Sequence, residues 1–384
     1  MTPIVQDAMT EKAANSNKGV VAVAMSGGVD SSVAAALLKS QGYEVIGVTM
    51  NLFSLPKEAC RSENLRSCCG RTAQEDANRV AIALGIPHFV VDFRAEFEVS
   101  VIADFCREYR GGRTPNPCIR CNRFIKFGLL LERVKALGAD FLATGHYANG
   151  GIDPASGRRL LRKGIDAAKD QSYFLYPLTQ AELSRTLFPV GEYTKSRIRA
   201  LAAEFRLPVA EKAESQEICF IPDDDYPRFL KERWPDAFCP GPIVDMRGKK
   251  IGTHGGIAHF TVGQRRGLGI AAPRPLYVVA IDVGKNTIVA GGNEDLYRQG
   301  LEASDVNWIS EEGPAAPRAA RARIRYKHVE APAMITPRDS GKVLVEFEKA
   351  QRAVTPGQAV VFYDGDIVLG GGIITRAFDG SPDA

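Results

Sequence analysis

The sequence lacks several features that would assign the protein to a simple class. No hydrophobic run in its 384 residues reaches the length of a membrane span, and its first residues include no apolar core of a signal peptide. Its net charge of +4 is too small to demand a polyanionic partner. We therefore expect a cytoplasmic protein without membrane contact, favour a monomer, and expect a disordered tail over residues 1–18.

Cysteine frameworks for disulfides or zinc are also poorly supported. The eight cysteines are scattered along a chain that we expect in the cytosol, where structural disulfides are rare. Cys118 and Cys121 form a C-x-x-C pair, but no second such pair is present to complete a zinc ribbon. Each cysteine must therefore be interpreted from its own surroundings.

The first half of the chain alternates strand-like and helix-like segments. The predicted strands are residues 20–25, 44–49, 88–92 and 140–144, and the predicted helices are residues 31–40, 72–84, 96–109 and 122–137. This alternation is typical of an α/β fold with a doubly wound parallel sheet and helices on both faces. We assign this domain to residues 19–212.

The sequence changes character after Lys212. Proline, glycine and short apolar pieces predict a small central domain of low regularity over residues 213–290. The remainder, residues 291–384, has an all-β pattern: residues 342–347 alternate in polarity, and residues 360–369 predict a hairpin. We therefore expect a C-terminal β-barrel.

A glycine-rich string, Ser26-Gly27-Gly28-Val29-Asp30-Ser31-Ser32, separates the first predicted strand from the first predicted helix. Its glycines let the backbone approach a phosphate, and the helix start offers N–H groups and a positive dipole end. Asp30 is a candidate for placing Mg²⁺. No Gly-Lys-Thr follows, so the string differs from loops that serve γ-phosphate transfer. It resembles the PP-loop of ATP pyrophosphatases, although a plain strand-to-helix turn is the alternative.

A second informative string is Thr114-Pro115-Asn116-Pro117-Cys118-Ile119-Arg120-Cys121-Asn122. Its prolines stiffen an extended loop, and we predict that Asn122 caps the following helix. Cys121 would then lie at a helix amino terminus, where the dipole favours the reactive thiolate. The cations predicted to surround it are Arg107, Arg110, Arg113, Arg120, Arg123 and Lys126. Cys219, much further along the chain, is by itself equally well explained as a core thiol.

Seven motifs occur in order along the chain and together resemble the bacterial tRNA-specific 2-thiouridylase family. They are the SGGVDSS loop, TPNPCIRCN, ATGHY at 143–147, KDQSYFL at 169–175, EICF at 217–220, GQRRGLG at 263–269 and VTPGQ at 354–358. The resemblance covers nearly the whole chain. It implies a PP-loop domain of the adenine nucleotide alpha hydrolase-like type, a small central domain and a C-terminal β-barrel. It also implies the activity of a tRNA-uridine 2-sulfurtransferase.

The resemblance also implies a role for each matching residue. ATP would be bound by Ala24, Met25, Ser26, Gly27, Gly28, Val29, Asp30, Ser31, Met50 and Gly145. The target base would meet Asn116, Pro117 and Cys118, and the tRNA would contact Lys169, Asp170, Gln171, Arg325 and Tyr326. Cys121 would be the nucleophile and Cys219 the persulfide carrier, and these two would form a redox disulfide.

The chemistry of thiolation agrees with a pyrophosphate-releasing loop. The C2 carbonyl of uridine is a poor electrophile, and attachment of AMP turns its oxygen into a good leaving group. We therefore expect ATP and Mg²⁺ as cofactors, the wobble uridine of the anticodon loop as target, and AMP and pyrophosphate as products. A persulfide relay protein would supply the sulfur, and a low thiol pKa would assist its transfer.

Alternatives to this mechanism stay open at this point. Some members of the family have aspartate where this chain has Cys118, and with cysteine there, Cys118, Cys121 and Cys219 offer the ligands of a [4Fe–4S] cluster with one open iron. A PP-loop synthetase that transfers nitrogen would need neither Cys121 nor Cys219. An RNA-binding protein that senses metal or redox state would show no tRNA-dependent conversion of ATP to AMP.

Residues 321–327 offer a second surface for tRNA. Cations alternate with other residues there, so a strand would place Arg321, Arg323, Arg325 and Lys327 on one face. An edge strand kept soluble by its charges is the alternative.

Overall fold

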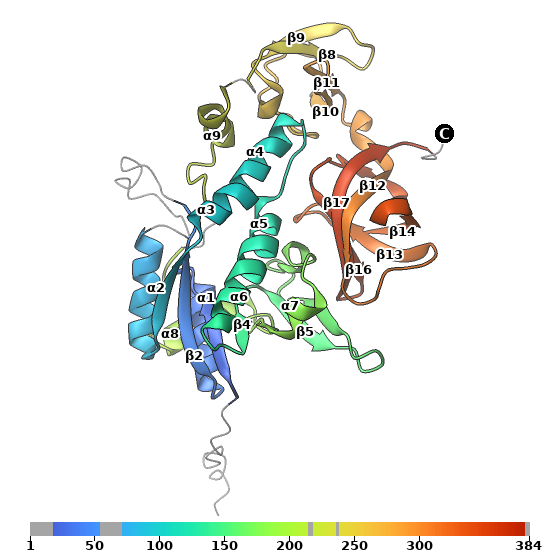
Figure 1. The fold of residues 1–384 in the computed structure, drawn as a ribbon. Helices are drawn as coiled ribbons and strands as arrows, with labels where there is room; N and C mark the ends of the chain where they lie inside the picture. The colour runs from blue at the N-terminus through green and yellow to red at the C-terminus, as the bar shows by residue number, and fades with distance from the viewer. Residues whose placement is uncertain (1–17, 54–70, 214–217, 236–237, 381–384) are drawn as a thin grey trace, which may run out of the picture.

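The computed structural model describes residues 18–53, 71–213, 218–235 and 238–380, so residues 1–17 of the predicted tail lie outside the described part. Three successive parts are visible in Figure 1: a blue-to-green α/β domain, a yellow β domain above it and an orange-to-red barrel at its side. No helix of the described part is long and apolar enough to cross a membrane.

A five-stranded parallel sheet, in the order β3-β2-β1-β4-β7, forms the centre of the first domain. Its strands are β1 (Val20–Ala24), β2 (Glu44–Asn51), β3 (His88–Asp92), β4 (Phe141–Ala143) and β7 (Thr186–Leu187). Val21 and Val23 of β1 belong to one core, whereas Ala22 belongs to the core on the opposite face. Burial on both faces explains why β1 and β2 are nearly continuous apolar runs.

Helices cover both faces of this sheet. One layer comprises α1 (Val29–Ser40), α2 (Arg71–Leu84) and α8 (Lys195–Glu204). The other layer comprises a first long helix, made of α3 (Arg94–Phe97), η2 (Glu98–Ile102) and α4 (Ala103–Arg110), and a second long helix, made of α5 (Pro117–Arg120), η3 (Cys121–Leu130) and α6 (Leu131–Ala136). The middle segment of each long helix is π-helical. The predicted doubly wound α/β domain is confirmed.

The second long helix begins at Pro117, earlier than the predicted start at Asn122. Asn116 caps it, because its side-chain oxygen accepts a hydrogen bond from the Cys118 N–H at 3.2 Å. Pro117 suits the first helical position, where its missing N–H has no partner to lose. The prediction that Asn122 is the cap is wrong: this side chain is buried and donates to the Phe174 carbonyl at 3.1 Å.

The central domain is more regular than its composition predicts. After α9 (Tyr226–Arg233), a four-stranded sheet has the order β10-β11-β8-β9. Its strands are β8 (Gly241–Val244), β9 (Lys250–His254), β10 (Tyr277–Asp282) and β11 (Thr287–Gly291), and Ile243, Phe260, Val278 and Ile288 are in its small core. The expectation of low regularity is wrong because many of the prolines and glycines lie in the connection between β9 and β10.

The C-terminal strands close into the predicted β-barrel. The order is β12-β15-β14-β13-β16-β17, and β12 pairs with β17 to close it. The strands are β12 (Tyr297–Trp308), β13 (Arg318–Arg323), β14 (Ala331–Arg338), β15 (Lys342–Arg352), β16 (Ala359–Asp364) and β17 (Ile367–Phe378). A hairpin of the first domain, β5 (Ala148–Ile152) and β6 (Arg159–Lys163), joins this sheet by a bridge between Arg162 and Ile367. No sequence pattern predicts that addition.

The predicted row of cations at residues 321–327 does not form. β13 ends at Arg323, and Arg325 follows in a bend. Arg321 and Arg323 both lie near Glu330, at 3.9 and 3.0 Å. The Arg325 side chain donates to the Ala353 carbonyl at 3.0 Å. The prediction is wrong because the strand ends before Arg325, and acceptors of the barrel itself bind Arg321, Arg323 and Arg325.

Buried charges join the barrel to the first domain. Asp170, only 3% exposed, accepts a hydrogen bond from Arg323 at 3.2 Å. Glu330 pairs with Arg323 at 3.0 Å and with Lys163 of β6 at 2.7 Å. Both cations also lie over the ring of Tyr363, 5.2 and 4.5 Å from its centroid. A buried charge is costly unless it is paired, so this network fixes how the barrel sits on the first domain.

We expect Arg323→Met to lower the free energy of unfolding by about 3–5 kcal/mol, because Asp170 would keep a buried charge without its cation. Arg321→Met is the matched control: it lies on the same strand near the same Glu330, but it is 49% exposed. Arg321→Met should lower the free energy of unfolding by only about 0–1 kcal/mol. Urea unfolding measures both values, and equal losses would contradict the role assigned to the buried network.

Candidate active site

The phosphate loop lies between the end of β1 and the start of α1. Gly27 has a φ of +68°, which favours glycine, and Gly28 directly precedes the helix. The Ser32 hydroxyl donates to the Gly28 carbonyl at 2.8 Å, and the Ser26 N–H donates to the Ser31 hydroxyl at 3.2 Å. These bonds hold the loop at a helix amino terminus, where N–H groups attract a phosphate.

Two glycines of this site have no room for a side chain. A Cβ on Gly27 would lie 2.3 Å from the carbonyl oxygen of Ala73 in α2. A Cβ on Gly145, which follows β4, would lie 2.6 Å from the backbone nitrogen of Ser31. The loop is therefore packed between α2 and the carboxyl end of β4, at the sheet edge where such folds bind ligands.

Asp30 is already bound by two side chains that the sequence analysis missed. Lys195, at the start of α8, donates to both carboxylate oxygens at 2.7 and 2.9 Å. The Tyr147 hydroxyl donates to the same carboxylate at 2.7 Å. The expectation that Asp30 places Mg²⁺ does not fit this arrangement, because an ammonium group occupies the carboxylate. Tyr147 lies inside the ATGHY motif, which was the available signal, whereas Lys195 belongs to none of the motifs.

The other residues predicted to bind ATP lie along the same edge with different exposure. Ser26 is exposed and Ala24 is half-buried, whereas Met25 and Met50 are only 2% and 8% exposed. The Thr49 hydroxyl donates to the Met25 carbonyl at 2.8 Å. The two methionines thus offer little surface to an adenine in this arrangement, and their contact with it stays a prediction.

Cys118 and Cys121 lie near the start of the second long helix, one turn apart. Cys118 is exposed, whereas Cys121 is 7% exposed and packs in the core of the first domain. Because the helix begins at Pro117, Cys118 is nearer than Cys121 to the N–H groups of the first turn. The argument that placed Cys121 at the helix terminus therefore applies more directly to Cys118.

The arginines around these thiols are paired with acids. The pairs are Arg107–Asp104, Arg113–Glu108, Arg120–Asp104 and Arg123–Asp305. The Arg113 guanidinium donates to both oxygens of Glu108, at 2.6 and 2.7 Å, and lowers the pKa of that carboxyl. Carboxylates therefore balance four of the arginines in the predicted cluster. Asp305 belongs to the barrel, so its position opposite Arg123 was not visible in the sequence.

Cys219 reaches the same region through its neighbour Phe220. The Phe220 ring packs against Phe97 and Phe105 of the first long helix, with centroids 5.7 and 5.4 Å apart. Cys219 is half-buried and packs against the hydrophobic core that contains Cys121. The first long helix also contacts the second, which carries Cys121. Both cysteine-bearing segments therefore lie against one helix, and a disulfide between these thiols stays a prediction.

Both later domains contact the loop that leads to Cys118. The Thr114 N–H donates to the Pro356 carbonyl at 2.9 Å. The Gln358 side chain donates to the carbonyls of Thr114 and Pro115, at 2.9 and 3.3 Å. From the central domain, the Thr261 hydroxyl accepts from the Thr114 hydroxyl at 3.1 Å. The VTPGQ motif was visible in the sequence, but its position against this loop was not.

The residues predicted to contact tRNA differ in their burial and in their contacts within the protein. Asp170 is buried, and the Gln171 side chain accepts from the Tyr147 N–H at 3.0 Å. Tyr326 packs against Phe174, with ring centroids 4.4 Å apart, and Lys169 is half-buried. Asp170 and Gln171 thus hold protein segments in place.

Two groups near the site have shifted pKa values. Burial lowers the pKa of His146 well below its usual value, and the charge of Lys126 adds to this effect. His146 is therefore neutral at pH 7, and its Nδ1 lies 2.8 Å from the Thr144 hydroxyl. Burial raises the pKa of Cys106 to about 12, so this thiol stays protonated and unreactive near neutral pH.

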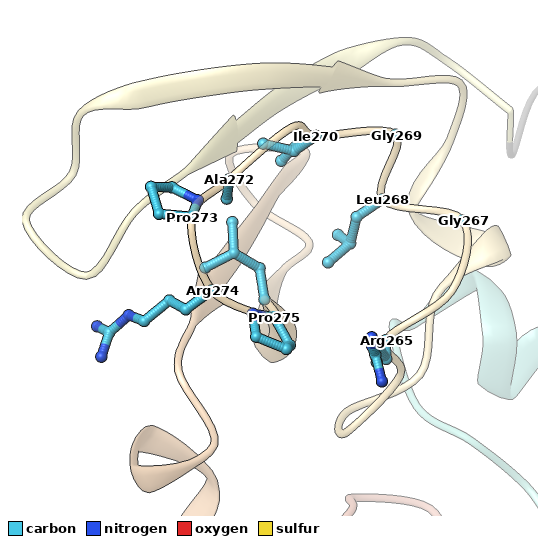
Figure 2. A pocket seen from close by; sticks show the side chains of 10 residues that line it. Arg265, Gly267, Leu268, Gly269, Ile270, Ala272, Pro273, Arg274 and Pro275 are labelled. Atoms are coloured by element: carbon cyan, nitrogen blue, oxygen red, sulfur yellow. The ribbon is translucent and has the colours of Figure 1, made fainter.

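A separate pocket of about 330 Å³ lies in the central domain. Figure 2 shows Leu268 pointing into the space between its walls, while the Arg274 side chain extends away from it. The Gln264 side chain shapes this turn by donating to the Arg266 carbonyl at 2.9 Å. None of the predicted ATP, thiol or tRNA residues lines the pocket, so it is no candidate for the chemistry of the cysteines.

The thiols do not form a set suited to a metal cluster. Among the described residues, which include Cys118, Cys121 and Cys219, no three His, Cys, Asp or Glu side chains are close enough to hold a metal ion. The [4Fe–4S] alternative therefore does not fit this arrangement. Mg²⁺ is commonly held by substrate phosphates, which ATP would provide.

Three protein-family models match successive parts of the chain. Residues 19–223 match the tRNA methyl transferase HUP domain, residues 227–292 the tRNA methyl transferase PRC-barrel domain, and residues 298–374 the aminomethyltransferase beta-barrel domain. A tRNA-specific 2-thiouridylase MnmA of Symbiobacterium thermophilum is 55% identical over 94% of this chain and 93% of its own length. The same enzyme of Heliobacterium modesticaldum is 56% identical over 94% of each chain. The chain belongs to this 2-thiouridylase family.

We expect Gly145→Ala to weaken ATP binding by about tenfold or more, because the new Cβ must displace the backbone of Ser31 in the phosphate loop. Gly150→Ala is the control, since no atom lies within 4 Å of a Cβ at that position. Equilibrium binding of labelled ATP compares the two variants. An affinity unchanged by Gly145→Ala would place the nucleotide elsewhere.

Alkylation should distinguish the exposed thiol from the buried one. At pH 8 we expect iodoacetamide to modify Cys118 within minutes and Cys106 only after unfolding, since the pKa of Cys106 is raised to about 12 and its side chain is buried. Mass spectrometry of peptides gives both rates. Fast labelling of Cys106 in the folded protein would contradict its assignment as a packing residue.

Proposed function

We propose that the chain is an ATP-dependent tRNA 2-thiouridylase that adenylates the C2 oxygen of the wobble uridine and replaces that oxygen with sulfur. The supporting observation is that relatives named for this activity are 52–56% identical to it over 93–94% of the chain. The site geometry agrees with this activity. The first domain contains the phosphate loop, and both cysteine-bearing segments and the barrel lie against this domain.

In the proposed first step, ATP binds at the phosphate loop and its α-phosphate accepts the uridine C2 oxygen. Pyrophosphate leaves, and the base carries AMP. Amide groups at the start of α1 suit the negative charge of the departing pyrophosphate. The Asp30–Lys195 pair at this helix start keeps the local charge balanced before ATP arrives.

In the proposed second step, Cys219 carries a persulfide received from a relay protein. The Cys121 thiolate attacks the inner sulfur of this persulfide, which releases hydrosulfide and forms a Cys121–Cys219 disulfide. Hydrosulfide then attacks C2 of the base, and AMP leaves. A cellular reductant must restore both thiols before the next turnover. In a variant of this step, the terminal sulfur of the persulfide attacks C2 and AMP leaves. The Cys121 thiolate then attacks the Cys219 sulfur, which breaks the S–S bond, leaves the outer sulfur on the base and forms the same disulfide.

The proposed substrate surface includes the exposed Cys118 and the loop before it. At the start of the second long helix Cys118 is exposed, Asn116 is half-buried and Pro117 is buried. We propose that an unpaired wobble base is presented to this helix start, which costs little for a base that is not stacked in a duplex. Lys169, Arg325 and Tyr326 lie where the first domain meets the barrel, and we propose that they border the bound tRNA. We further propose a monomeric enzyme that acts in the cytoplasm.

We expect Cys219→Ser to reduce formation of thiolated uridine by at least about 100-fold, while tRNA-dependent release of pyrophosphate continues and AMP stays on the base, because adenylation needs no thiol. Cys121→Ser should likewise lose thiolation while it still releases pyrophosphate. The assay supplies tRNA, ATP, Mg²⁺ and a persulfide donor, and measures thiolated uridine and pyrophosphate together. Normal thiolation by either variant would refute the roles assigned to these cysteines.

Cys118→Asp is the matched control, since some members of the family have aspartate at this position. Without a cluster, this variant should keep at least about a tenth of the thiolation rate, which corresponds to a barrier change below about 1.4 kcal/mol. Complete loss of thiolation, together with stoichiometric iron in anaerobically purified protein, would favour the cluster instead.

A further inference from the structure

The phosphate loop contains no lysine of its own, but the fold brings one to it from the end of the domain. The Lys212 ammonium donates to the Gly27 carbonyl at 2.9 Å and to the Asp76 carboxylate at 2.5 Å. It is 33% exposed, and Asp76 is 6% exposed. Lys212 is 185 residues from Gly27 in the sequence and belongs to none of the motifs that carry the family resemblance.

This bond fixes the orientation of one peptide group in the loop. In a trans peptide the C=O and the following N–H point in opposite directions. Because the Gly27 carbonyl is directed at Lys212, the Gly28 N–H must point to the opposite side. Among the described residues, no acceptor is found for the Gly28 N–H. It is thus available to a ligand at the start of α1.

The contact of Lys212 is held in place by α2. Burial alone would raise the pKa of Asp76, but hydrogen bonds and charge from Lys212 and Arg79 outweigh it and lower that pKa. Asp76 is therefore an anion at neutral pH and keeps the ammonium in position. The same helix brings the Ala73 carbonyl against Gly27, where a Cβ would lie 2.3 Å from that oxygen, so only glycine fits at this position.

We propose that Lys212 is a positioning residue for the phosphates of ATP: it holds the Gly27–Gly28 peptide so that the Gly28 N–H faces the nucleotide. This inference rests on the proposed use of ATP. Without Lys212, the peptide is able to rotate, and its carbonyl oxygen would then face the phosphates and repel them. Loss of Lys212 should therefore weaken the binding of the phosphates and leave the binding of the nucleoside almost unchanged.

The test compares the affinities of ATP and adenosine in the full chain without tRNA or sulfur donor. Lys212→Met should weaken ATP binding about tenfold, equal to about 1.4 kcal/mol, and change adenosine binding less than about twofold. Lys212→Arg, which keeps a cationic donor, should restore most of the ATP affinity. Arg79→Met is the matched control, because it removes the other cation from Asp76 and leaves the Gly27 contact intact.

Three results would overturn the proposal: unchanged ATP affinity in Lys212→Met, equal weakening of ATP and adenosine, or an equal effect of Arg79→Met. Should Lys212→Met fail to fold in a urea titration, Asp76→Asn gives the same comparison, since it releases the lysine without removing it. ATP binding is measured apart from thiolation, so failure of the proposed function would appear only in the tRNA assay.

Discussion

The loop before the cysteine-bearing helix is held by hydrogen bonds from outside its domain, and the thiol site depends on them. A segment with two prolines lacks two N–H donors, so its remaining polar groups must find partners elsewhere. Pro356 and Gln358 of the barrel supply those partners for Thr114 and Pro115. A Cβ on Gly357 would lie 2.8 Å from the Thr114 nitrogen, so only glycine permits this approach. The barrel is therefore a structural part of the thiol site as well as a candidate tRNA surface.

The phosphate loop likewise depends on groups from elsewhere in the chain, in this case the charged side chains of two lysines. Asp30 is matched by Lys195, and Asp76 is matched by Lys212. Both lysines come from the part of the domain that follows the sheet, so the loop gains its cations only when the domain is complete. A loop with a lysine inside its own string would not need this arrangement. These two ion pairs of the nucleotide site therefore require the folded domain as far as Lys212.

Local sequence patterns predicted most of the first domain, because alternating apolar runs and glycine stops report directly on buried strands and helix ends. Local patterns failed where a group distant in the sequence determines the structure of a segment. Asn122 has the side chain of a cap, but the cap is Asn116, six residues earlier, and the helix begins at Pro117. The cations at 321–327 alternate like a strand, but β13 ends at Arg323, and Glu330 and the Ala353 carbonyl bind Arg323 and Arg325. Partners such as Asp305 for Arg123 follow from the tertiary fold alone. Cys219 was assigned from the resemblance. Its neighbour Phe220 packs against the first long helix, and the role of the thiol stays a prediction.

The paired arginines also constrain how a tRNA would be recognised. Arg120 is 29% exposed and its partner Asp104 only 7%, so separating this pair would leave the buried carboxylate with Arg107 as its ion-pair partner. Arg123 and Asp305 are 37% and 47% exposed, and an exposed pair contributes only about 0–1 kcal/mol. A phosphate of the RNA is therefore able to replace Asp305 at Arg123 with little loss. Because this pair links the cysteine-bearing helix to the barrel, the exchange would remove one contact between them, while Gln358 still holds the loop.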